Sequence, residues 1–594
     1  MQETKVQQTG WKAVSKTGAV AAGGARAVEA GIEILDGGGN AADAAAATIF
    51  ALNVTDHFAC SIGGEVPVLI FDAENQEVKA LSGQGRAPCS QEAVDWYMKN
   101  GIPGEGNMKM APVPSVVDLC ITMLKRYGTR TFEEIIAPTL AILDEGEEDW
   151  HPRLAVTLRK LIEEEQLIPG SRDEKLQAAT DRFYGRNKRC SDIADDLEAF
   201  YIQKGGFLRK ADLAAHVTLI EDPVTVNYRG YTVCKCGTWT QGPYLCQALR
   251  LLEGFDLKGM GHCSTDYVHV VTEAIKLAMA DRDEYYGDPA FVGVPMAALL
   301  SDPYTEIRRP LIDMKVASQE VRPGDPYRLA PLKGPGVIRP GAGGTTTCVV
   351  ADRWGNVVAA TPSANVYRPN VDGGKTGVTY GNRLRSLNTT PGHPNCIQPG
   401  KRPRITLTPT MVLKKGKPIL AISVAGGDLQ DQTTLNLLLD FVEFGIRPEA
   451  AVTAPRFATS HHEDSFDPNP NREQTFIRAG SLTISDQVNG RVRNALARRG
   501  HKVEAKSGPI ASPVMLYINQ KSGKLHAAGD PAAHRHAAGL KDKPKQAGKA
   551  KKAAPKREKR EYKTETAAKA QQKIWEKKGY RVTRRKNTLY IGKA

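Results

Sequence analysis

The feature that most constrains the fold is an abrupt change of pattern at residue 345. Residues 331–344 (PLKGPGVIRPGAGG) are so rich in glycine and proline that they predict an exposed, irregular linker. Before this linker the pattern is mainly helical, and after it short alternating strands begin at once. Helices and strands that are segregated in this way predict an α/β fold in which helices and sheets form separate layers.

The helical half opens with two well-marked helices. Residues 24–36 carry apolar side chains at the i, i+4, i+7 spacing of an amphipathic helix, and the three glycines at 37–39 end it. Asn40 is placed to cap a second, almost wholly apolar helix over residues 41–52. The rest of this half is mainly helical in pattern, with a strand-like interruption at residues 224–233.

The strand-rich half predicts two hairpins followed by a helix. Residues 345–361 form the first hairpin, with a turn at 353–356. A second hairpin is predicted over residues 407–425. Gly426-Gly427 then leads into a helix from about residue 428 to residue 444.

The charge of the chain is concentrated at one end. The formal net charge is +14 over 594 residues, but residues 541–594 alone contain 20 Lys/Arg and 5 Asp/Glu, so residues 1–540 are close to neutral. The hydrophobic content of 41% is typical of a soluble globular protein. No apolar run reaches the ~20 residues that cross a bilayer, so no membrane span is expected.

The basic end, residues 541–594, predicts a partly disordered tail. Its Lys/Ala/Pro-rich start cannot bury a core, whereas residues 564–578 favour a helix and residues 580–591 a short strand pair. Four aromatic residues lie among its cations: Tyr562, Trp575, Tyr580 and Tyr590. This mixture indicates contact with nucleic acid or another anionic surface, and a solvated tail without a partner is the alternative.

Cysteine usage and the N-terminal residues predict a cytoplasmic protein. The first 20 residues carry several charges and no apolar core segment, so no secretory signal is expected. The ten cysteines are scattered, and Cys234 and Cys236 form the only close pair, without the second pair of a structural zinc site. The histidines show no metal-ligand spacing either. We expect reduced thiols, no metal and no cofactor.

The first candidate catalytic residue is Thr345, which lies where the linker meets the first strand of the strand-rich half. If the Gly344–Thr345 bond were cut, Thr345 would carry a hydroxyl nucleophile and a free α-amine on one residue. An α-amine titrates near pH ~8, so it can act as general base for its own hydroxyl near neutral pH. A threonine at a strand start is also common without any catalytic role, because threonine favours strands.

A second candidate is Gly426-Gly427, between a strand and a helix. Backbone N–H groups at the start of a helix lack intrahelical partners, and the helix dipole favours negative charge there. Such groups can stabilise an oxyanion, and glycine lets a substrate approach the backbone closely. An ordinary strand-to-helix turn is the alternative interpretation.

Together these segments resemble the γ-glutamyltransferase family. The resemblance runs from Ala19 to Leu540 in the family's order and does not include the basic tail. It rests on AAGGARAVEAGIEILDGGGNAADAAAATIFALNVTDHFACSIGGEVPVLIFD, RYGTRTFEEIIAPTLAILDEG, YRGYTVCKCGTWTQGPYLCQALRLLEGFDL, EAIKLAMADRDEYYGDPAFVGVP, TTTCVVADRWGNVVAATPSAN and PGKRPRITLTPTMVLKKGKPILAISVAGGDLQDQ.

The resemblance implies an N-terminal-nucleophile (Ntn) hydrolase with a four-layer αββα sandwich. Such proenzymes cut themselves before the nucleophilic threonine, and both chains stay associated. Here the large chain would comprise residues 1–344 and the small chain residues 345–540, followed by the tail 541–594. The threonine attacks an amide to give an acyl-enzyme, which water or an amine then resolves.

The resemblance also assigns residues to roles. Thr345 takes the position of the nucleophile, with Thr346 as the alternative, because a slip of one residue turns the hydroxyl to the other face of the strand. Ser363 takes the position of the family's second threonine, which orients the nucleophile. Asn365 matches a substrate-binding asparagine, and Gly426-Gly427 matches the oxyanion pair.

Several positions carry residues that differ from those of the family, and all of them lie where the family binds the acyl group of its substrate. The family has an arginine three residues before Ala87-Pro88, and here that position is Gln84. Arg86 lies on the same face of an extended strand and could take over the role of that arginine. Ser386 stands at the position where the family has the acidic residue that pairs with the substrate α-amine. Arg383 and Arg385 bring positive charge nearby, and Ile405-Thr406 replaces the family's paired serines.

These differences leave two classes of substrate as alternatives. One is the γ-glutamyl group of the family. The other is an acyl group that ends in a carboxylate and lacks an α-amine, such as a glutaryl-like or oxamate-like group, which nearby arginines would bind. An inactive scaffold that binds nucleic acid through the tail is a further alternative.

Overall fold

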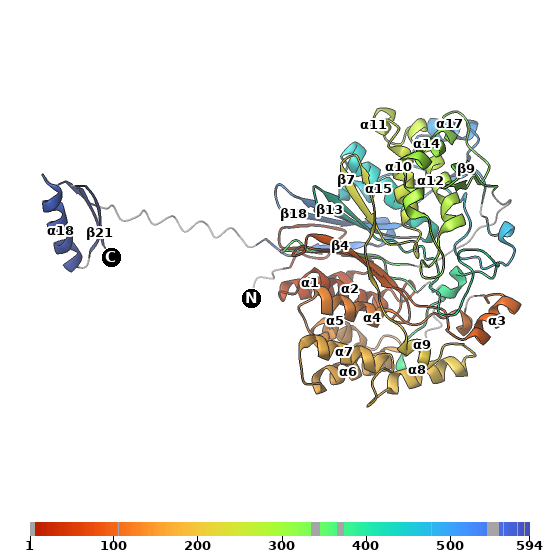
Figure 1. Ribbon diagram of the computed structural model, residues 1–594, viewed down its shortest axis with the longest axis horizontal. Coiled ribbons are helices and arrows are strands. Elements are labelled where there is room, and N and C mark those ends of the chain that lie inside the picture. Colours follow the sequence, from red (N-terminus) through yellow and green to blue (C-terminus); the bar gives the residue numbers. More distant parts are fainter. Residues whose placement is uncertain are drawn as a thin grey trace. The chain divides into compact units, whose positions relative to one another are not determined.

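The computed structural model describes residues 6–104, 106–333, 345–364, 373–476, 478–542, 558–561, 563–578, 580–586 and 588–593 (Figure 1). Two compact units are present, Met1–Lys541 and Asp542–Ala594. No helix among the described residues is both long enough and apolar enough to cross a membrane.

The larger unit is built on two antiparallel seven-stranded sheets. The first has the order β19 (His536–Gly539), β2 (Gly18–Ala22), β10 (Cys348–Asp352), β11 (Val357–Ala360), β3 (Val66–Asp72), β4 (Glu77–Gly83) and β5 (Ile220–Glu221). The second has the order β1 (Lys12–Ser15), β18 (Lys524–Gly529), β17 (Ser512–Asn519), β13 (Lys417–Ala425), β12 (Thr410–Lys414), β7 (Tyr231–Lys235) and β6 (Val224–Tyr228).

The two sheets pack face to face, and helices cover both outer faces. An apolar core between the sheets contains Leu69 and Val349 from the first sheet and Met411 and Leu516 from the second. The first sheet is covered by α1 (Ala25–Asp36), α2 (Ala41–Thr55), α4 (Val116–Tyr127) and α5 (Phe132–Asp144). The second is covered by α10 (Pro243–Leu252), α12 (Thr265–Tyr285) and α15 (Gln430–Phe444). This arrangement confirms the predicted four-layer αββα sandwich (Figure 1).

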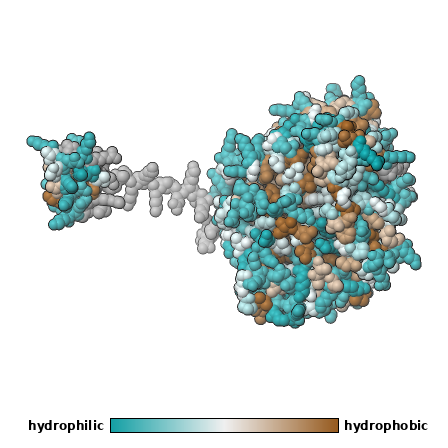
Figure 2. Space-filling model, viewed as in Figure 1, coloured by the Kyte–Doolittle hydropathy of each residue, from teal (hydrophilic) through white to brown (hydrophobic). Residues whose placement is uncertain are grey.

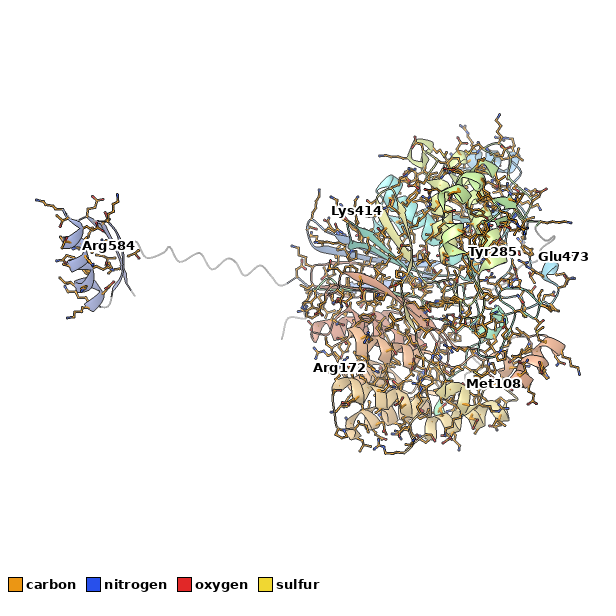
Figure 3. All side chains as sticks on the ribbon, viewed as in Figure 1. Met108, Arg172, Tyr285, Lys414, Glu473 and Arg584 are labelled. Atoms are coloured by element: carbon orange, nitrogen blue, oxygen red, sulfur yellow. The ribbon has the colours of Figure 1, made fainter. Side chains whose placement is uncertain are left out.

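The remaining elements are further helices and two small sheets that are separate from the two large ones. They are α3 (Gln91–Asn100), α6 (His151–Leu167), α7 (Arg172–Phe183), α8 (Asp192–Gln203), α9 (Lys210–Ala214), α11 (Leu257–Met260), α13 (Met296–Leu299), α14 (Asp302–Arg308), α16 (Pro448–Ala451), α17 (Gly490–Arg498), β8 (Gly324–Asp325), β9 (Ala330–Pro331), β14 (Phe457–Ala458), β15 (Ser481–Ser485) and β16 (Lys502–Lys506). Side chains fill the space between the layers (Figure 3), and the visible surface is mostly hydrophilic (Figure 2).

Local sequence signals explain several boundaries. The Asn40 side chain accepts from the backbone N–H of Asp43, whose carboxylate accepts from Asn40 N–H, so a capping box starts α2 as predicted. The first predicted hairpin is present as β10 and β11. Its ladder begins at Cys348 rather than at residue 345, because Pro362 on the facing segment has no N–H to donate. The predicted linker, residues 331–344, lies outside the described residues from 334 onwards.

The segments on either side of residue 345 are interleaved in both sheets. In the first sheet β10 and β11 lie between β2 and β3, which come from the earlier segment. In the second sheet β12, β13, β17 and β18 lie between β1 and β7. The predicted large and small chains therefore form one compact unit, and separating them would break the ladders of both sheets.

The C-terminal unit has a small fold of its own. It contains β20 (Glu558–Glu561), α18 (Glu565–Lys577), β21 (Tyr580–Arg585) and β22 (Thr588–Lys593), with the antiparallel order β20-β22-β21. The core consists of Ala568, Leu589 and Ile591, with Trp575 and Val582 packed against it. The predicted helix and strand pair are confirmed. β20 is an additional strand that pairs with β22, and the rest of the stretch predicted to be disordered, 543–557, lies outside the described residues.

Candidate active site

Thr345 lies just ahead of β10, an interior strand of its sheet. Thr345 is 8% exposed, whereas Thr346 and Thr347 are 0% exposed, so Thr345 is the least buried of the three threonines. The Thr346 N–H donates to the Pro362 carbonyl at 2.9 Å and holds this segment beside the residues that follow β11. The cleavage partner Gly344 lies outside the described residues.

The Thr346 hydroxyl points to the opposite side of the strand. A Cβ atom on Gly23 would overlap the Thr346 Oγ1 atom, which therefore faces the start of α1 and the end of α2. This hydroxyl has no hydrogen-bond partner among the described residues. Side chains alternate along an extended chain, so the geometry favours Thr345 over Thr346 as the residue that faces the site.

Ser363 lies next to the Thr345 hydroxyl, as the resemblance implies. Thr345 Oγ1 donates to Ser363 Oγ at 3.4 Å. The backbone of Ser363 is held by a two-way bridge to Glu65, with N–H to carbonyl distances of 2.8 and 2.9 Å. The hydroxyl that would orient the nucleophile thus has a fixed position. Asn365 lies outside the described residues, so its predicted role stays a prediction.

Gln430, the first residue of α15, is a site residue that the sequence analysis missed. Its side-chain amide lies 3.5 Å from Thr345 Oγ1. In the amide orientation that satisfies both groups, Nε2 donates to the carbonyls of Val424 and Thr406 at 3.0 Å each, so Oε1 faces the threonine. A polar residue four positions after Gly426 was the available signal, because the first turn of α15 follows that glycine turn directly.

Gly426 and Gly427 form the turn between β13 and α15. Both have positive φ, 149° and 59°, in a region that favours glycine. A Cβ atom on Gly427 would lie 2.9 Å from the Phe466 ring, and one on Gly426 would lie 2.8 Å from Ala511 Cβ. Because Gln430 of the following helix reaches Thr345, the turn lies on the same side of the sandwich as the threonine hydroxyl.

Arg383 and Glu65 form a buried ion pair beside Ser363. Arg383 Nε donates to Glu65 Oε1 at 2.6 Å, and Nη2 donates to Ser363 Oγ at 3.0 Å. The side chains of Arg383 and Glu65 are 1% and 0% exposed. Burial raises the pKa of Glu65 by more than Arg383 lowers it. The sequence did not predict Glu65 as a site residue, because no local pattern indicates that the residue just before β3 lies next to residue 383.

Arg385 and Phe466 lie next to the glycine turn. The Arg385 guanidinium is 4.9 Å from the centre of the Phe466 ring, and the same ring faces Gly427. The N–H of Phe466 donates to Asp464 at 2.9 Å. Burial and the nearby Asp428 carboxylate raise the pKa of Asp464 to about 7.

The other residues at predicted substrate positions are two buried hydroxyls, a buried glutamine and a half-buried arginine. The hydroxyls of Ser386 and Thr406 are buried and have no hydrogen-bond partner among the described residues. Gln84 is buried and donates to the Pro403 carbonyl. Arg86 is half-buried, and no hydrogen bond or ion pair joins its side chain to a described site residue. Its electrostatic neighbours are Cys89 and His216, so its predicted substrate role stays a prediction.

Arg535 is a second residue that the sequence analysis missed. Its Nη2 donates to the Thr345 carbonyl at 3.4 Å, and its Nη1 lies 3.7 Å from the Asp56 carboxylate. It therefore ties Thr345 to the end of α2. Among the described residues, no group of three His, Cys, Asp or Glu side chains is arranged to hold a metal ion.

A four-layer αββα sandwich with a threonine hydroxyl at the head of a central strand is the architecture of the N-terminal-nucleophile hydrolases. The gamma-glutamyltranspeptidase family model matches residues 27–190 and 149–540 of this chain. The chain belongs to the gamma-glutamyltranspeptidase family, and it is an enzyme of the amide hydrolase and acyltransferase type. Residues 541–594 lie beyond the match.

Individual relatives align with most of the chain. The glutathione hydrolase proenzyme of Bacillus subtilis (strain 168) is 28% identical over 562 residues, 89% of this chain and 92% of that protein. The acylase ACY 1 proenzyme of Pseudomonas sp. (strain SE83) is 29% identical over 539 residues, 84% and 89% of the two chains. The crystal structure of cephalosporin acylase from Bacillus halodurans is similar with a TM-score of 0.72 and 25% identity, over 90% of this chain and 98% of that one.

Proposed function

We propose that the chain cuts itself between Gly344 and Thr345 and that Thr345 is the nucleophile of the mature enzyme. The hydroxyl oxygen of Thr345 attacks the Gly344 carbonyl carbon, the C–N bond breaks, and the nitrogen takes up the hydroxyl proton to become the free α-amine. Water then hydrolyses the ester that links the two chains. The proenzyme names of relatives support this cleavage.

In the proposed reaction the new α-amine takes the hydroxyl proton as Oγ1 attacks the substrate amide. The N–H groups of Gly426 and Gly427 stabilise the oxyanion, and the amine returns the proton to the departing nitrogen. Water or an acceptor amine then attacks the acyl-enzyme and frees Oγ1. The observation that carries the proposal is the Thr345 hydroxyl, which is flanked by Ser363 and Gln430. The intact mass of the purified protein tests it.

We further propose that the acyl group ends in a carboxylate and lacks an α-amine. Arg385 lies beside the oxyanion turn, and its guanidinium suits a carboxylate. Arg383 is already paired with Glu65, so Arg385 is the group assigned to the carboxylate. Ser386 offers no charge to a substrate ammonium. The names of two relatives, acylase ACY 1 and cephalosporin acylase, support an acyl group other than γ-glutamyl.

The substrate class is tested with two anilides that differ only in the α-amine. We expect glutaryl p-nitroanilide to be hydrolysed with a kcat/KM at least ~10-fold above that of γ-glutamyl p-nitroanilide, because an ammonium without an anionic partner costs binding energy. Arg385→Ala should raise KM for the glutaryl compound, while the exposed Arg189→Ala should not. A preference for the γ-glutamyl compound would show that another acidic group, such as Asp464, binds the amine.

We also propose a cytoplasmic location. All ten cysteines are free thiols, and seven of them are buried, which suits a reducing compartment.

A second function is proposed for the C-terminal unit, the binding of nucleic acid. Helix α18 packs Ala568 and Trp575 against its sheet. Lys569, Lys573 and Lys577 follow each other at four-residue intervals and are all exposed, so they form one row of cations on the outer face, spaced about 6 Å apart along the helix. Arg584, labelled in Figure 3, lies on β21. Its Nη1 atom is 2.8 Å from the Glu565 carboxylate. A row of cations without a base-reading element suits phosphate contacts of low sequence specificity.

Retention on DNA and RNA at graded salt tests this second function. We expect deletion of residues 541–594 to abolish retention and leave amidase activity unchanged. Replacing Lys569, Lys573 and Lys577 with Gln should reduce the slope of log K against log salt by about 3, since each phosphate contact contributes about 0.9. The matched control replaces three exposed lysines of the larger unit, Lys258, Lys506 and Lys521. Retention that survives the deletion, or that falls equally in the control, would contradict the proposal.

A further inference from the structure

The Glu65–Arg383 pair is not explained by stability alone. It is almost completely buried, and Glu65 Oε2 and Arg383 Nη1 have no hydrogen-bond partner among the described residues. Removing two charges from water carries a large desolvation cost, and unsatisfied polar atoms add to that cost. An apolar pair of similar size would be expected at such a position if only packing mattered.

Its position instead connects the pair to the nucleophile. The chain of contacts runs from Glu65 to Arg383 at 2.6 Å, from Arg383 to Ser363 Oγ at 3.0 Å, and from Ser363 Oγ to Thr345 Oγ1 at 3.4 Å. Glu65 also bridges the backbone of Ser363 in both directions. One residue therefore fixes both the backbone of Ser363 and the cation that contacts its hydroxyl.

We propose that Glu65 and Arg383 are positioning residues of the reaction, which orient the Ser363 hydroxyl and hold one positive charge beside the nucleophile. A guanidinium can only donate, so the Ser363 oxygen must accept from Arg383. The Ser363 hydrogen is thereby directed to another acceptor, and once Thr345 Oγ1 has lost its proton, that oxygen lies within reach as an acceptor. The inference rests on the proposed role of Thr345.

The charges of the pair give opposite predictions for its two members. A cation near the Thr345 α-amine lowers the pKa of that amine, and an anion raises it. Arg383→Met should therefore move the acidic limb of the kcat profile up by about one pH unit, and Glu65→Gln should move it down. The other charged side chains around the site, Arg535 with Asp56 beside Thr345, and Arg385, Asp464 and Asp428 beside the glycine turn, are unchanged in both variants.

The experiment measures kcat, KM, the pH profile and the melting temperature of the self-cleaved enzyme. We expect Arg383→Met to lower kcat ~30- to 100-fold with a smaller effect on KM, and Arg383→Lys to recover part of it. The double variant Glu65→Gln/Arg383→Met should regain melting temperature, because no uncompensated charge is left, but not kcat. The matched control is the buried pair Arg308 and Asp281, replaced with Met and Asn, where the pH profile should stay in place.

Two results distinguish a failure of this inference from a failure of the proposed function. If the double variant regains kcat, or if both single variants shift the acidic limb in the same direction, the pair is structural and the inference is overturned. A wild-type chain that stays uncut and inactive would instead overturn the proposed function, and this inference with it. Where Arg383→Met fails to fold, Glu65→Gln still tests the downward shift of the acidic limb, and Arg383→Lys, which keeps the positive charge, should leave the limb in place.

Discussion

Thr345→Ala is expected to yield one uncut chain of 64.4 kDa with no amidase activity, whereas the wild-type protein separates under denaturing conditions into two chains, the second beginning at Thr345. Without the hydroxyl there is no attack on Gly344, and without cleavage there is no free α-amine. The contacts of the hydroxyl with described residues are long, at 3.4 and 3.5 Å, so the melting temperature should change little. Intact mass and N-terminal sequencing of the chains make the measurement.

Two controls accompany this variant. Thr345→Ser keeps a hydroxyl in the same place and should still be cut, though more slowly. Thr346→Val keeps the shape of a side chain that faces Gly23, and it should be cut at Thr345 like the wild type. Cleavage of the Thr345→Ala variant, or a second chain that begins at Thr346, would assign the nucleophile to the neighbouring residue.

Gly427→Ala is expected to lower kcat at least ~100-fold, the cost of losing one oxyanion donor. The added Cβ would lie 2.9 Å from the Phe466 ring, so either the turn or the ring must shift. A shift of a few tenths of an ångström moves the backbone N–H away from the oxyanion, while substrate binding elsewhere is kept. Steady-state kinetics should therefore show the loss in kcat rather than in KM.

Gly445→Ala is the matched control for this prediction. Gly445 ends the same helix, α15, with a φ of 70° that is close to the 59° of Gly427, and a Cβ there would meet no atom within 4 Å. Both variants carry a similar backbone strain of about 1–2 kcal/mol and should lose similar melting temperature. If both lose kcat equally, strain rather than the oxyanion position explains the effect at Gly427.

Much of the fold was predictable because its signals are local. The capping box of Asn40 and Asp43, the hairpin of β10 and β11, and the glycine turn before α15 depend on residues within a few positions of one another. Backbone sterics and hydrogen bonding within such a window need no information from the rest of the chain. The same holds for α18 and the β21–β22 pair in the basic tail.

The boundaries that were missed depend on a facing segment. The first strand begins at Cys348 rather than at Thr345, because Pro362 on the opposite segment cannot donate to the ladder. β20 was expected to be disordered, and it is a strand because β22 offers it an edge. Neither partner can be identified from composition alone.

The sequence by itself determined the chemistry that is available: a threonine after a Gly/Pro-rich linker, a glycine pair before a helix, and arginines where the family has other residues. Only the tertiary structure decided which side chains meet. Glu65 and Arg383 are 318 residues apart, Gln430 is 85 residues from Thr345, and Arg535 is 190 residues from it. Such contacts follow from the register of interleaved strands and the packing of four layers, which arises from the burial of the whole core and leaves no local pattern in the sequence.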